Sequence, residues 1–344
     1  MEWIVPQYSN NQVDKAGTLF TKPKFWTQAT DVENALTIIE NHRASHAYPL
    51  LILRIDLTGR ARKIDSNALI AQRTKRLWSI ELKMRRFPKM RLSHMQDIGG
   101  CRAVVSAVPA VRRLARSYKK SRTKNKLLRI DDYIATPRDS GYRGIHLIYS
   151  YQSEKKPEYN GLKIEIQLRS RQQHAWATAV ETVDAFTGQA LKGGGGEQDW
   201  KCFFALMGTY IAIQEKTASV PNTPDDEQVL KKEIARYAQK LEVDGHLQAY
   251  RATMQSFEQD IEGARYYLLR LDTKAWTINI TGYRGGQLTQ AESDYVTAER
   301  QAVNRPEQDA VLVSVGSLSE LKRGYPNYFA DTHVFLKTLN EAIS

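Results

Sequence analysis

The sequence has few cysteines and no long apolar runs. Only two of its 344 residues are cysteine, Cys101 and Cys202, too few and too far apart for a disulfide framework or a zinc cage. The longest apolar runs, such as residues 48–53, fall far short of the roughly 20 residues that span a bilayer. The first residues also lack the basic segment and apolar stretch of a secretory signal. We therefore expect a protein of the cytoplasm, with no membrane partner.

Acidic side chains are scarce in one part of the chain. The whole sequence has 50 Lys and Arg against 38 Asp and Glu, a formal net charge of +12. Residues 51–150 hold 24 basic and 7 acidic side chains, whereas residues 223–344 carry a net charge of −4. Such asymmetry indicates a polyanionic partner, such as nucleotides, nucleic acid or acidic lipid. The acidic C-terminal part could itself dock on the basic region.

Strand and helix patterns alternate through the middle of the chain. The length predicts two or three domains, and a hydrophobic fraction of 42% is enough for a sizeable core. Runs of β-branched and alternating residues indicate strands, and apolar residues at helical spacing indicate helices between them. The expected strands are at residues 98–108, 127–135, 145–152 and 162–170, and the expected helices at residues 73–86 and 172–190.

A turn-rich segment at residues 219–226 marks a boundary in the chain. Residues 227–262 then read as one or two amphipathic helices, and β structure resumes near residue 265. Its β-β-α-β-α order is typical of a small α+β domain. The expected parts are an N-terminal helical segment (1–50), a central domain (51–218), a helical linker (219–264) and a C-terminal α+β domain (265–344).

Two carboxylates occupy strand positions suited to metal or base chemistry. Alternation along residues 162–168 places Glu165, Gln167 and Arg169 on one polar strand face. Asp97 precedes a second strand, just before a Gly-Gly pair. Carboxylates on neighbouring strands can share a Mg²⁺ ion, or one can bind metal while the other acts as a base.

Two further segments suit a nucleotide. The loop at residues 140–144 offers backbone donors and an aromatic face, so Tyr142 could contact a base while Arg138 and Arg143 bind phosphates. Upstream, basic and hydroxyl side chains recur at helical spacing, which would place them on one face as a polyphosphate clamp. They are Arg73, Lys75, Ser79 and Lys83.

Four sequence blocks together resemble the RelA/SpoT synthetase family, the alarmone synthetases that transfer pyrophosphate from ATP to a ribose 3′-hydroxyl. They stand in the family's order over roughly residues 45–215. The blocks are RTKRLWSIELK (73–83), MQDIGGCR (95–102), DYIATPRDSGYRGIH (132–146) and EIQLRSRQQHAWA (165–177).

The resemblance implies an α+β fold, a mixed sheet flanked by helices, and a Mg²⁺-dependent reaction on ATP. Asp97 and Glu165 would be the metal-binding and catalytic carboxylates, with Glu165 as the base for the attacking hydroxyl. By position, Arg73 and Arg102 would sandwich the adenine of ATP, and Lys75, Ser79 and Lys83 would hold its phosphates. Tyr142 would stack on the acceptor base, with Arg138, His146, Gln167 and His174 lining the acceptor side.

The chain departs from the family pattern in the acceptor loop. Arg138 stands where a lysine is usual, which keeps the charge, and Gly144 replaces a serine, which can loosen the loop. Both changes bear on the acceptor more than on the reaction. No His-Asp pair typical of the family's hydrolase half precedes the synthetase blocks, so we expect synthesis without hydrolysis.

The layout also resembles the fused toxin–antitoxin members of the family, the CapRel type. There the synthetase pyrophosphorylates the 3′-CCA end of tRNA, a C-terminal domain restrains it, and some systems defend against phage. Tyr325 and Tyr328 form a Tyr-x-x-Tyr element like the neutralising motif of those domains. They could occupy the adenine slot between Arg73 and Arg102 through cation–π contacts, or simply pack the last helix. A phage or other protein acting on this domain is the expected trigger.

The sequence leaves the acceptor open. The basic region suits tRNA, because phosphate contacts supply affinity without reading sequence. ATP, GDP and GTP are polyanions as well, so a guanosine or adenosine nucleotide acceptor is the alternative. A chain that only senses nucleotides or binds RNA is a third reading. The presence of both carboxylates and of Tyr142 argues against it.

Overall fold

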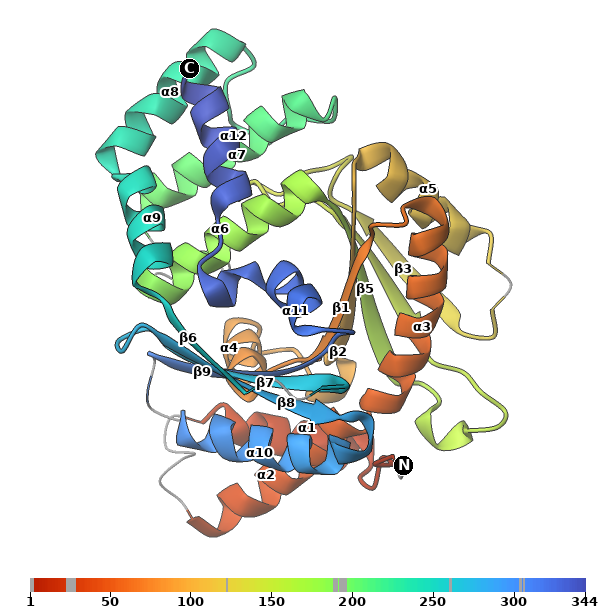
Figure 1. The fold of residues 1–344 in the computed structure, drawn as a ribbon. Coiled ribbons are helices and arrows are strands. Elements are labelled where there is room, and N and C mark those ends of the chain that lie inside the picture. The colour runs from red at the N-terminus through yellow and green to blue at the C-terminus, as the bar shows by residue number, and fades with distance from the viewer. Residues whose placement is uncertain are drawn as a thin grey trace.

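In the computed structural model, the described residues form one mixed sheet of nine strands (Figure 1). The structure describes residues 3–22, 29–121, 123–187, 191, 197–259, 262–302, 305 and 307–344. Along the sheet the order is β3-β4-β5-β2-β1-β9-β7-β8-β6. The strands are β1 (Leu69–Thr74), β2 (Gly99–Val105), β3 (Lys126–Asp132), β4 (Ile145–Ser150), β5 (Lys163–Ser170), β6 (Gln255–Gln259), β7 (Ala264–Asp272), β8 (Thr277–Arg284) and β9 (Gln308–Ser314).

Helices cover the sheet and extend beyond one end of it (Figure 1). The predicted α+β class, a mixed sheet flanked by helices, is confirmed. The helices are α1 (Asn10–Phe20), α2 (Ala29–Ala44), α3 (Ala47–Ile64), α4 (Leu77–Arg86), α5 (Val108–Lys119), α6 (Arg171–Thr187), α7 (Gln198–Gln214), α8 (Glu227–Lys240), α9 (Val243–Thr253), α10 (Leu288–Gln301), α11 (Leu318–Gly324) and α12 (His333–Ile343), with the 3-10 turns η2 (Leu92–His94), η3 (Pro157–Tyr159), η5 (Gly285–Gln287) and η6 (Pro326–Phe329).

The alternation of β5 explains how the sheet separates core from site. Its even-numbered residues, Ile164, Ile166 and Leu168, are fully buried against α3 and α5. Its odd-numbered side chains point to the other face, as predicted, because successive residues of a strand alternate between faces. β5 runs parallel to β2 and antiparallel to β4. The polar face is therefore built from three neighbouring strands.

The C-terminal elements continue this sheet. From β7 onward the order is β7, β8, α10, β9, α11 and α12, which is the predicted β-β-α-β-α order with one additional helix, α11. β9 then pairs with β1 at Gln72↔Ser314 and Arg73↔Val313, so the C-terminal strands extend the central ones. The chain finally returns through α12, where Phe335 and Leu339 are buried in the apolar cluster of α6, α7 and α8. The boundaries near residues 219 and 265 stay predictions.

The predicted helix at residues 73–86 is wrong at its start. Arg73 lies in β1, Lys75 lies after the strand, and α4 begins only at Leu77. β1 gains hydrogen bonds from β2 on one side and β9 on the other, and this tertiary pairing overrides the local helical pattern. Lys75 and Ser79 therefore do not share a helix face.

The expected helical stretch at residues 227–262 also ends early. α9 stops at Thr253, and residues 255–259 form β6, which pairs in parallel with β8. The end of the helix expected at residues 172–190, and the glycine run at residues 193–196 that follows it, lie outside the described residues. No helix among the described residues is long and apolar enough to cross a membrane.

Two buried histidines predict acid sensitivity. Burial lowers the pKa of His42 to about 4 and that of His46 to about 3. Between pH 6.5 and 4 the unfolded chain binds a proton at His42 that the folded chain does not, so stability falls as the pH falls through this window. From the 1.36 kcal/mol per pKa unit, His42 alone should cost about 2 kcal/mol at pH 5 relative to pH 7.

Urea unfolding at pH 7 and pH 5 measures this loss. We expect His42→Gln to reduce the pH dependence by about 2 kcal/mol. An identical pH dependence in wild type and His42→Gln would contradict the assignment.

Candidate active site

Asp97 lies between two lysines just before β2. Its carboxylate oxygens accept hydrogen bonds from Lys75 Nζ and Lys83 Nζ, each at 2.8 Å. Lys75 follows β1 and Lys83 is in the last turn of α4. Asp97 therefore connects the two ends of residues 75–83. Burial alone would raise the pKa of Asp97, but the two ammonium groups lower it. Asp97 is therefore an ionised carboxylate in a cationic setting.

A chain of polar side chains crosses β4 and β5 on the predicted face. His146 Nδ1 lies 2.9 Å from Glu165 Oε1, and the Tyr142 hydroxyl lies 2.5 Å from His146 Nε2. Burial lowers the pKa of His146, but Tyr142 and Glu165 outweigh it and raise it to about 9. Burial raises the pKa of Glu165, but His146 lowers it below its ordinary value. At neutral pH an imidazolium is thus paired with a carboxylate.

Gln167 and Arg169 complete this chain. Gln167 Nε2 donates to Glu165 Oε2 at 2.7 Å, so both oxygens of Glu165 are held. The Arg169 guanidinium donates to Gln167 Oε1 at 3.0 Å and to the Tyr142 hydroxyl at 3.1 Å. Burial raises the pKa of Tyr142, but Arg169 and His146 lower it to about 8. The ring and hydroxyl of Tyr142 are therefore fixed by cationic neighbours.

The acceptor loop is held close to the helices behind it. Gly141 has φ of +91°, and a Cβ there would lie 2.6 Å from the carbonyl oxygen of Phe204 in α7. Only glycine allows this approach without strain. Arg138 is exposed, and its guanidinium lies 4.3 Å from the ring centroid of Tyr133. The Tyr133 ring in turn lies 5.2 Å from that of His146, beside Tyr142.

Arg143 does not join the set that the sequence predicted. It is 2% exposed, and its guanidinium pairs with Glu215 at 3.4 Å and donates to Thr217 at 3.1 Å. Side chains of successive loop residues diverge, so Tyr142 reaches the sheet face while Arg143 points to the end of α7. Arg143 thus joins the loop to the end of α7, away from the polar sheet face, and its expected contact with phosphate stays a prediction.

His174 and Ser79 lie at the margins of the site. His174 is buried on α6, where burial and the nearby Arg102 and Arg169 hold its pKa well below the ordinary value. A neutral imidazole therefore faces the arginines. Ser79 is half-buried in α4, one turn before Lys83.

The predicted adenine slot is covered by the C-terminal segment, by which we mean the part of the chain from β7 (Ala264–Asp272) onward. Arg102 in β2 donates to the carbonyl of Gly324, and its guanidinium lies 5.2 Å from the ring centroid of Tyr325. The Tyr325 hydroxyl donates to the carbonyl of Gln72 in β1 at 2.9 Å. Tyr325 is only 4% exposed. Arg73, the other predicted adenine contact, follows Gln72 and lies opposite Gly100 of β2.

Tyr328 lies next to a second arginine. Arg76 donates to the Tyr328 hydroxyl at 3.2 Å and forms an ion pair with Asp309. Tyr325 and Tyr328 also belong to the apolar cluster that α11 and η6 form with β7 and β9. The two tyrosines therefore contact the arginines and pack the C-terminal segment at the same time.

Three residues of this site were not assigned a role from the sequence. Tyr133, Arg76 and Arg169 all stand inside the four blocks, and Arg169 shares the predicted polar face of β5. Block membership and strand alternation were the available signals. The contacts of Arg76 could not be predicted from the sequence, because its partners lie more than 200 residues away in the chain.

The carboxylates fit a Mg²⁺ site of the kind completed by substrate. Among the described residues no group of three or more His, Cys, Asp or Glu side chains could hold a metal. Mg²⁺ is commonly bound by one or two carboxylates together with substrate phosphates. Asp97 and Glu165 supply such hard oxygen donors, and the negative charge of Asp97 acts to raise the pKa of Glu165. They are the residues that would hold the ion.

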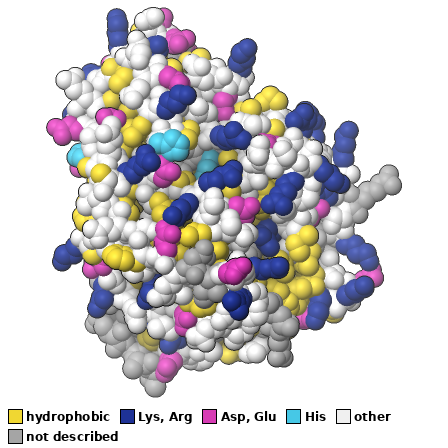
Figure 2. All heavy atoms as spheres, in the orientation of Figure 1, with side chains coloured by type: hydrophobic (Ala, Val, Ile, Leu, Met, Phe, Trp, Pro, Cys, Tyr) yellow, Lys and Arg dark blue, Asp and Glu magenta, His cyan; other side chains and the backbone are white. Residues whose placement is uncertain are grey.

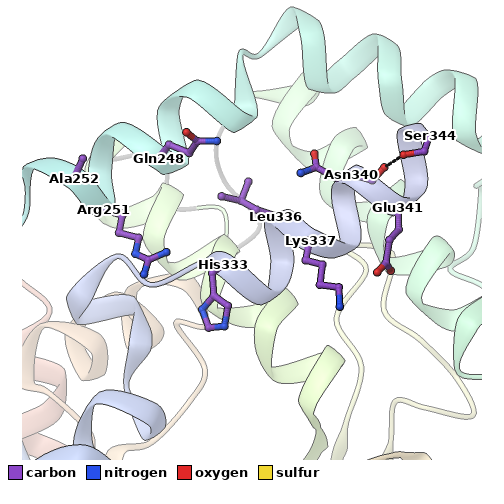
Figure 3. Close-up of a pocket in the computed structure, with 9 residues that line it drawn as sticks. All are labelled: Gln248, Arg251, Ala252, His333, Leu336, Lys337, Asn340, Glu341 and Ser344. Atoms are coloured by element: carbon purple, nitrogen blue, oxygen red, sulfur yellow. Dashed lines mark hydrogen bonds between the residues drawn. The ribbon is translucent and has the colours of Figure 1, made fainter.

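One face of the molecule is mixed in charge. On the face shown in Figure 2, Lys and Arg side chains are interspersed with Asp and Glu and with hydrophobic side chains. A separate depression of about 810 Å³ lies between α9 and α12, lined by residues that include Arg251, His333, Lys337 and Glu341 (Figure 3). It contains none of the predicted site residues.

An α+β domain that gathers carboxylates, lysines and arginines on one sheet face is suited to a polyphosphate ligand. Residues 72–184 match the family model described as "Region found in RelA / SpoT proteins". This part of the chain is therefore a region of the RelA/SpoT type.

Individual relatives match shorter parts of the chain at low sequence identity. The chain is 29% identical over 90 residues to the GTP pyrophosphokinase YwaC of Bacillus subtilis, covering 26% of this chain and 42% of that one. It is 31% identical over 117 residues to YjbM of the same organism, covering 33% and 55%. The chain thus spans about half the length of these curated relatives. A GTP pyrophosphokinase family protein from Streptococcus pneumoniae is a structural neighbour with 25% identity and a TM-score of 0.41, covering 49% of this chain and 84% of that one.

Proposed function

We propose that this chain is a pyrophosphokinase, which transfers the β,γ-pyrophosphate of ATP to a ribose 3′-hydroxyl. The observation that carries the proposal is the ion pair of Glu165 with His146 on the sheet face next to Asp97 and its two lysines. The family match over residues 72–184 and the relatives named GTP pyrophosphokinases support the same reaction.

In the proposed mechanism Glu165 removes the proton of the attacking 3′-hydroxyl. The oxygen forms a bond to the β-phosphorus of ATP as the bond to the α-phosphate oxygen breaks, and AMP leaves. His146 and Gln167 hold the two oxygens of Glu165, so the carboxylate stays ionised and oriented. General-base catalysis of this kind contributes about 10²–10⁴-fold to a rate.

Lys75 and Lys83 would exchange Asp97 for phosphate when ATP binds. Both ammonium groups now neutralise one carboxylate, and both are close enough to it to serve one ligand. Their transfer to the ATP phosphates would free Asp97 as an oxygen ligand. A bound Mg²⁺ would supply charge neutralisation of the phosphates. Arg73 and Arg102 would flank the adenine.

We further propose that the C-terminal segment restrains this reaction. Tyr325 covers Arg102, which is one wall of the proposed adenine slot, so ATP and Tyr325 would compete for the same guanidinium. The acceptor in this proposal is the 3′-CCA end of tRNA, and the chain is a translation-blocking toxin. The +17 net charge of residues 51–150 supports a nucleic-acid acceptor. A phage or other protein that displaces the segment would be the trigger, in a system of phage defence.

A label-transfer assay tests the reaction and the acceptor together. The purified chain and its Tyr325→Ala/Tyr328→Ala variant receive γ-labelled ATP and Mg²⁺, with deacylated tRNA, GDP, GTP and ADP in parallel reactions. We expect label on tRNA and AMP as the second product. Label on GDP or GTP instead would make the chain an alarmone synthetase in nucleotide signalling. Absence of AMP from every reaction would favour a catalytically inactive sensor.

A further inference from the structure

Glu299 reaches across the molecule to the start of α4. It lies in α10, 8% exposed, and its carboxylate Oε1 accepts a hydrogen bond from the backbone N–H of Leu77 at 2.8 Å. Leu77 is the first residue of α4, and the N-cap residue Arg76 makes no side-chain capping bond. The first N–H groups of a helix need such acceptors, and a negative charge there is favourable. Glu299, which is 222 positions away in the chain, therefore caps the N-terminus of α4 in place of a neighbouring side chain.

The same carboxylate is held by two further partners. Tyr295, one turn earlier in α10, donates its hydroxyl to Glu299 Oε1 at 2.8 Å, and Arg43 of α2 pairs with Oε2 at 2.8 Å. Burial lowers the pKa of Arg43, but Glu299 raises it above the ordinary value. A carboxylate this deeply buried persists only when it is paired and hydrogen-bonded, as here.

Arg43 extends the contact to the other end of the same segment. Its Nε donates to the backbone carbonyl of Lys75 at 3.0 Å. Glu299 and Arg43 therefore fix the backbone at both Lys75 and Leu77, the two residues between which the chain leaves β1 and enters α4. Lys75 and Lys83, on either side of this point, are the lysines that meet at Asp97.

We infer that Glu299 is a positioning residue for ATP, because from the C-terminal segment it sets the orientation of the Lys75–Lys83 segment that would bind the phosphates. This inference rests on the proposed function. The C-terminal segment would then have two opposite roles: α10 supports the phosphate side of the site, and Tyr325 covers the adenine side. Docking of α10 is then a requirement for activity, and only displacement of α11 and η6 would relieve restraint.

The test compares two changes in α10. Glu299→Gln keeps the shape but removes the charge that pairs with Arg43. Arg300→Gln is the matched control, because Arg300 also joins α10 to α2, through Glu40 at 3.3 Å, but this ion pair lies nearer the surface than that of Glu299 and Arg43. In Glu299→Gln we expect the KM for ATP to rise about tenfold with little change in kcat or in the KM for the acceptor. Arg300→Gln should match the wild type.

Backbone hydrogen exchange of residues 75–83 provides a readout that does not depend on turnover. Exchange should become faster in Glu299→Gln and not in Arg300→Gln, and Glu299→Asp should restore part of the protection. Should Glu299→Gln not fold, Tyr295→Phe removes one bond to the carboxylate and should give a smaller change of the same kind.

Unchanged exchange, or an unchanged KM for ATP in a folded Glu299→Gln protein, would overturn the inference. A lower kcat together with a higher KM for both ATP and the acceptor would show a merely structural role. If the wild type transfers no pyrophosphate, the proposed function fails, and the affinity for a non-hydrolysable ATP analogue then replaces KM in the same comparison.

Discussion

Replacing Glu165 by glutamine should reduce AMP formation from ATP by about a thousandfold, within the range expected when a general base is removed. The amide has nearly the same shape and can still bond to Gln167, but it cannot accept the proton of the acceptor hydroxyl. His146 would also lose the carboxylate that raises its pKa. Asp97→Asn should cause a comparable loss, because Lys75 and Lys83 would lose their shared anion and the proposed ion a ligand.

The measurement is AMP released per enzyme in the presence of Mg²⁺ and acceptor, with the thermal midpoint as a check on folding. Glu158→Gln is a matched control, since Glu158 is a carboxylate in the connection between β4 and β5, where it pairs with Lys156 at 3.3 Å. It should retain full activity. Unchanged AMP release in both Glu165→Gln and Asp97→Asn would show that the catalytic carboxylates lie elsewhere.

The second large effect should come from the double variant Tyr325→Ala/Tyr328→Ala. It removes the ring over Arg102, the bond to the Gln72 carbonyl and the acceptor for Arg76. A cation–π contact contributes about 0.5–2 kcal/mol, and the buried rings add apolar contact with α11 and β9. Because 1.4 kcal/mol corresponds to a factor of ten in an equilibrium, we expect ATP turnover to rise at least about tenfold and expression to become more toxic.

Single variants separate the contributions of the two tyrosines. Tyr325→Phe keeps the ring over Arg102 but loses the bond to Gln72, so it should remain largely restrained. Phe329→Ala is the control in η6, which directly follows Tyr325, because the ring centroid of Phe329 lies 5.8 Å from Lys322 Nζ. A double variant that folds but is less active than the wild type would show that the tyrosines only pack the C-terminal segment.

The structure changes how restraint should be tested. A truncation near residue 265 would remove β9 from the edge of β1, α10 with its cap on α4, and α12 from the cluster of α6 to α8. We expect such a truncated chain to be poorly folded and inactive rather than released. Point variants in η6 are therefore the informative ones, and AMP formation by a well-folded truncation would contradict this expectation.

Local sequence determined much of the proposed site. Strict alternation along β5 was enough to place Glu165, Gln167 and Arg169 on one face, because a strand of period two that points Ile164 and Ile166 to one face points the residues between them to the other. The Gly- and Pro-rich character of residues 136–144 was enough to indicate a loop. These features depend on neighbours in the chain, so the sequence alone could predict them.

Long-range contacts decided the rest. Arg73 is in a strand because β2 and β9 bond to both edges of β1, and Arg143 turns inward because Glu215 offers a buried partner. Tyr325 reaches Arg102, and Glu299 caps α4, across more than 200 residues of chain. Pairing between distant segments leaves no periodic signal in either of them. The sequence therefore determined which residues could carry the chemistry, and the tertiary structure decided which of them meet and what covers them.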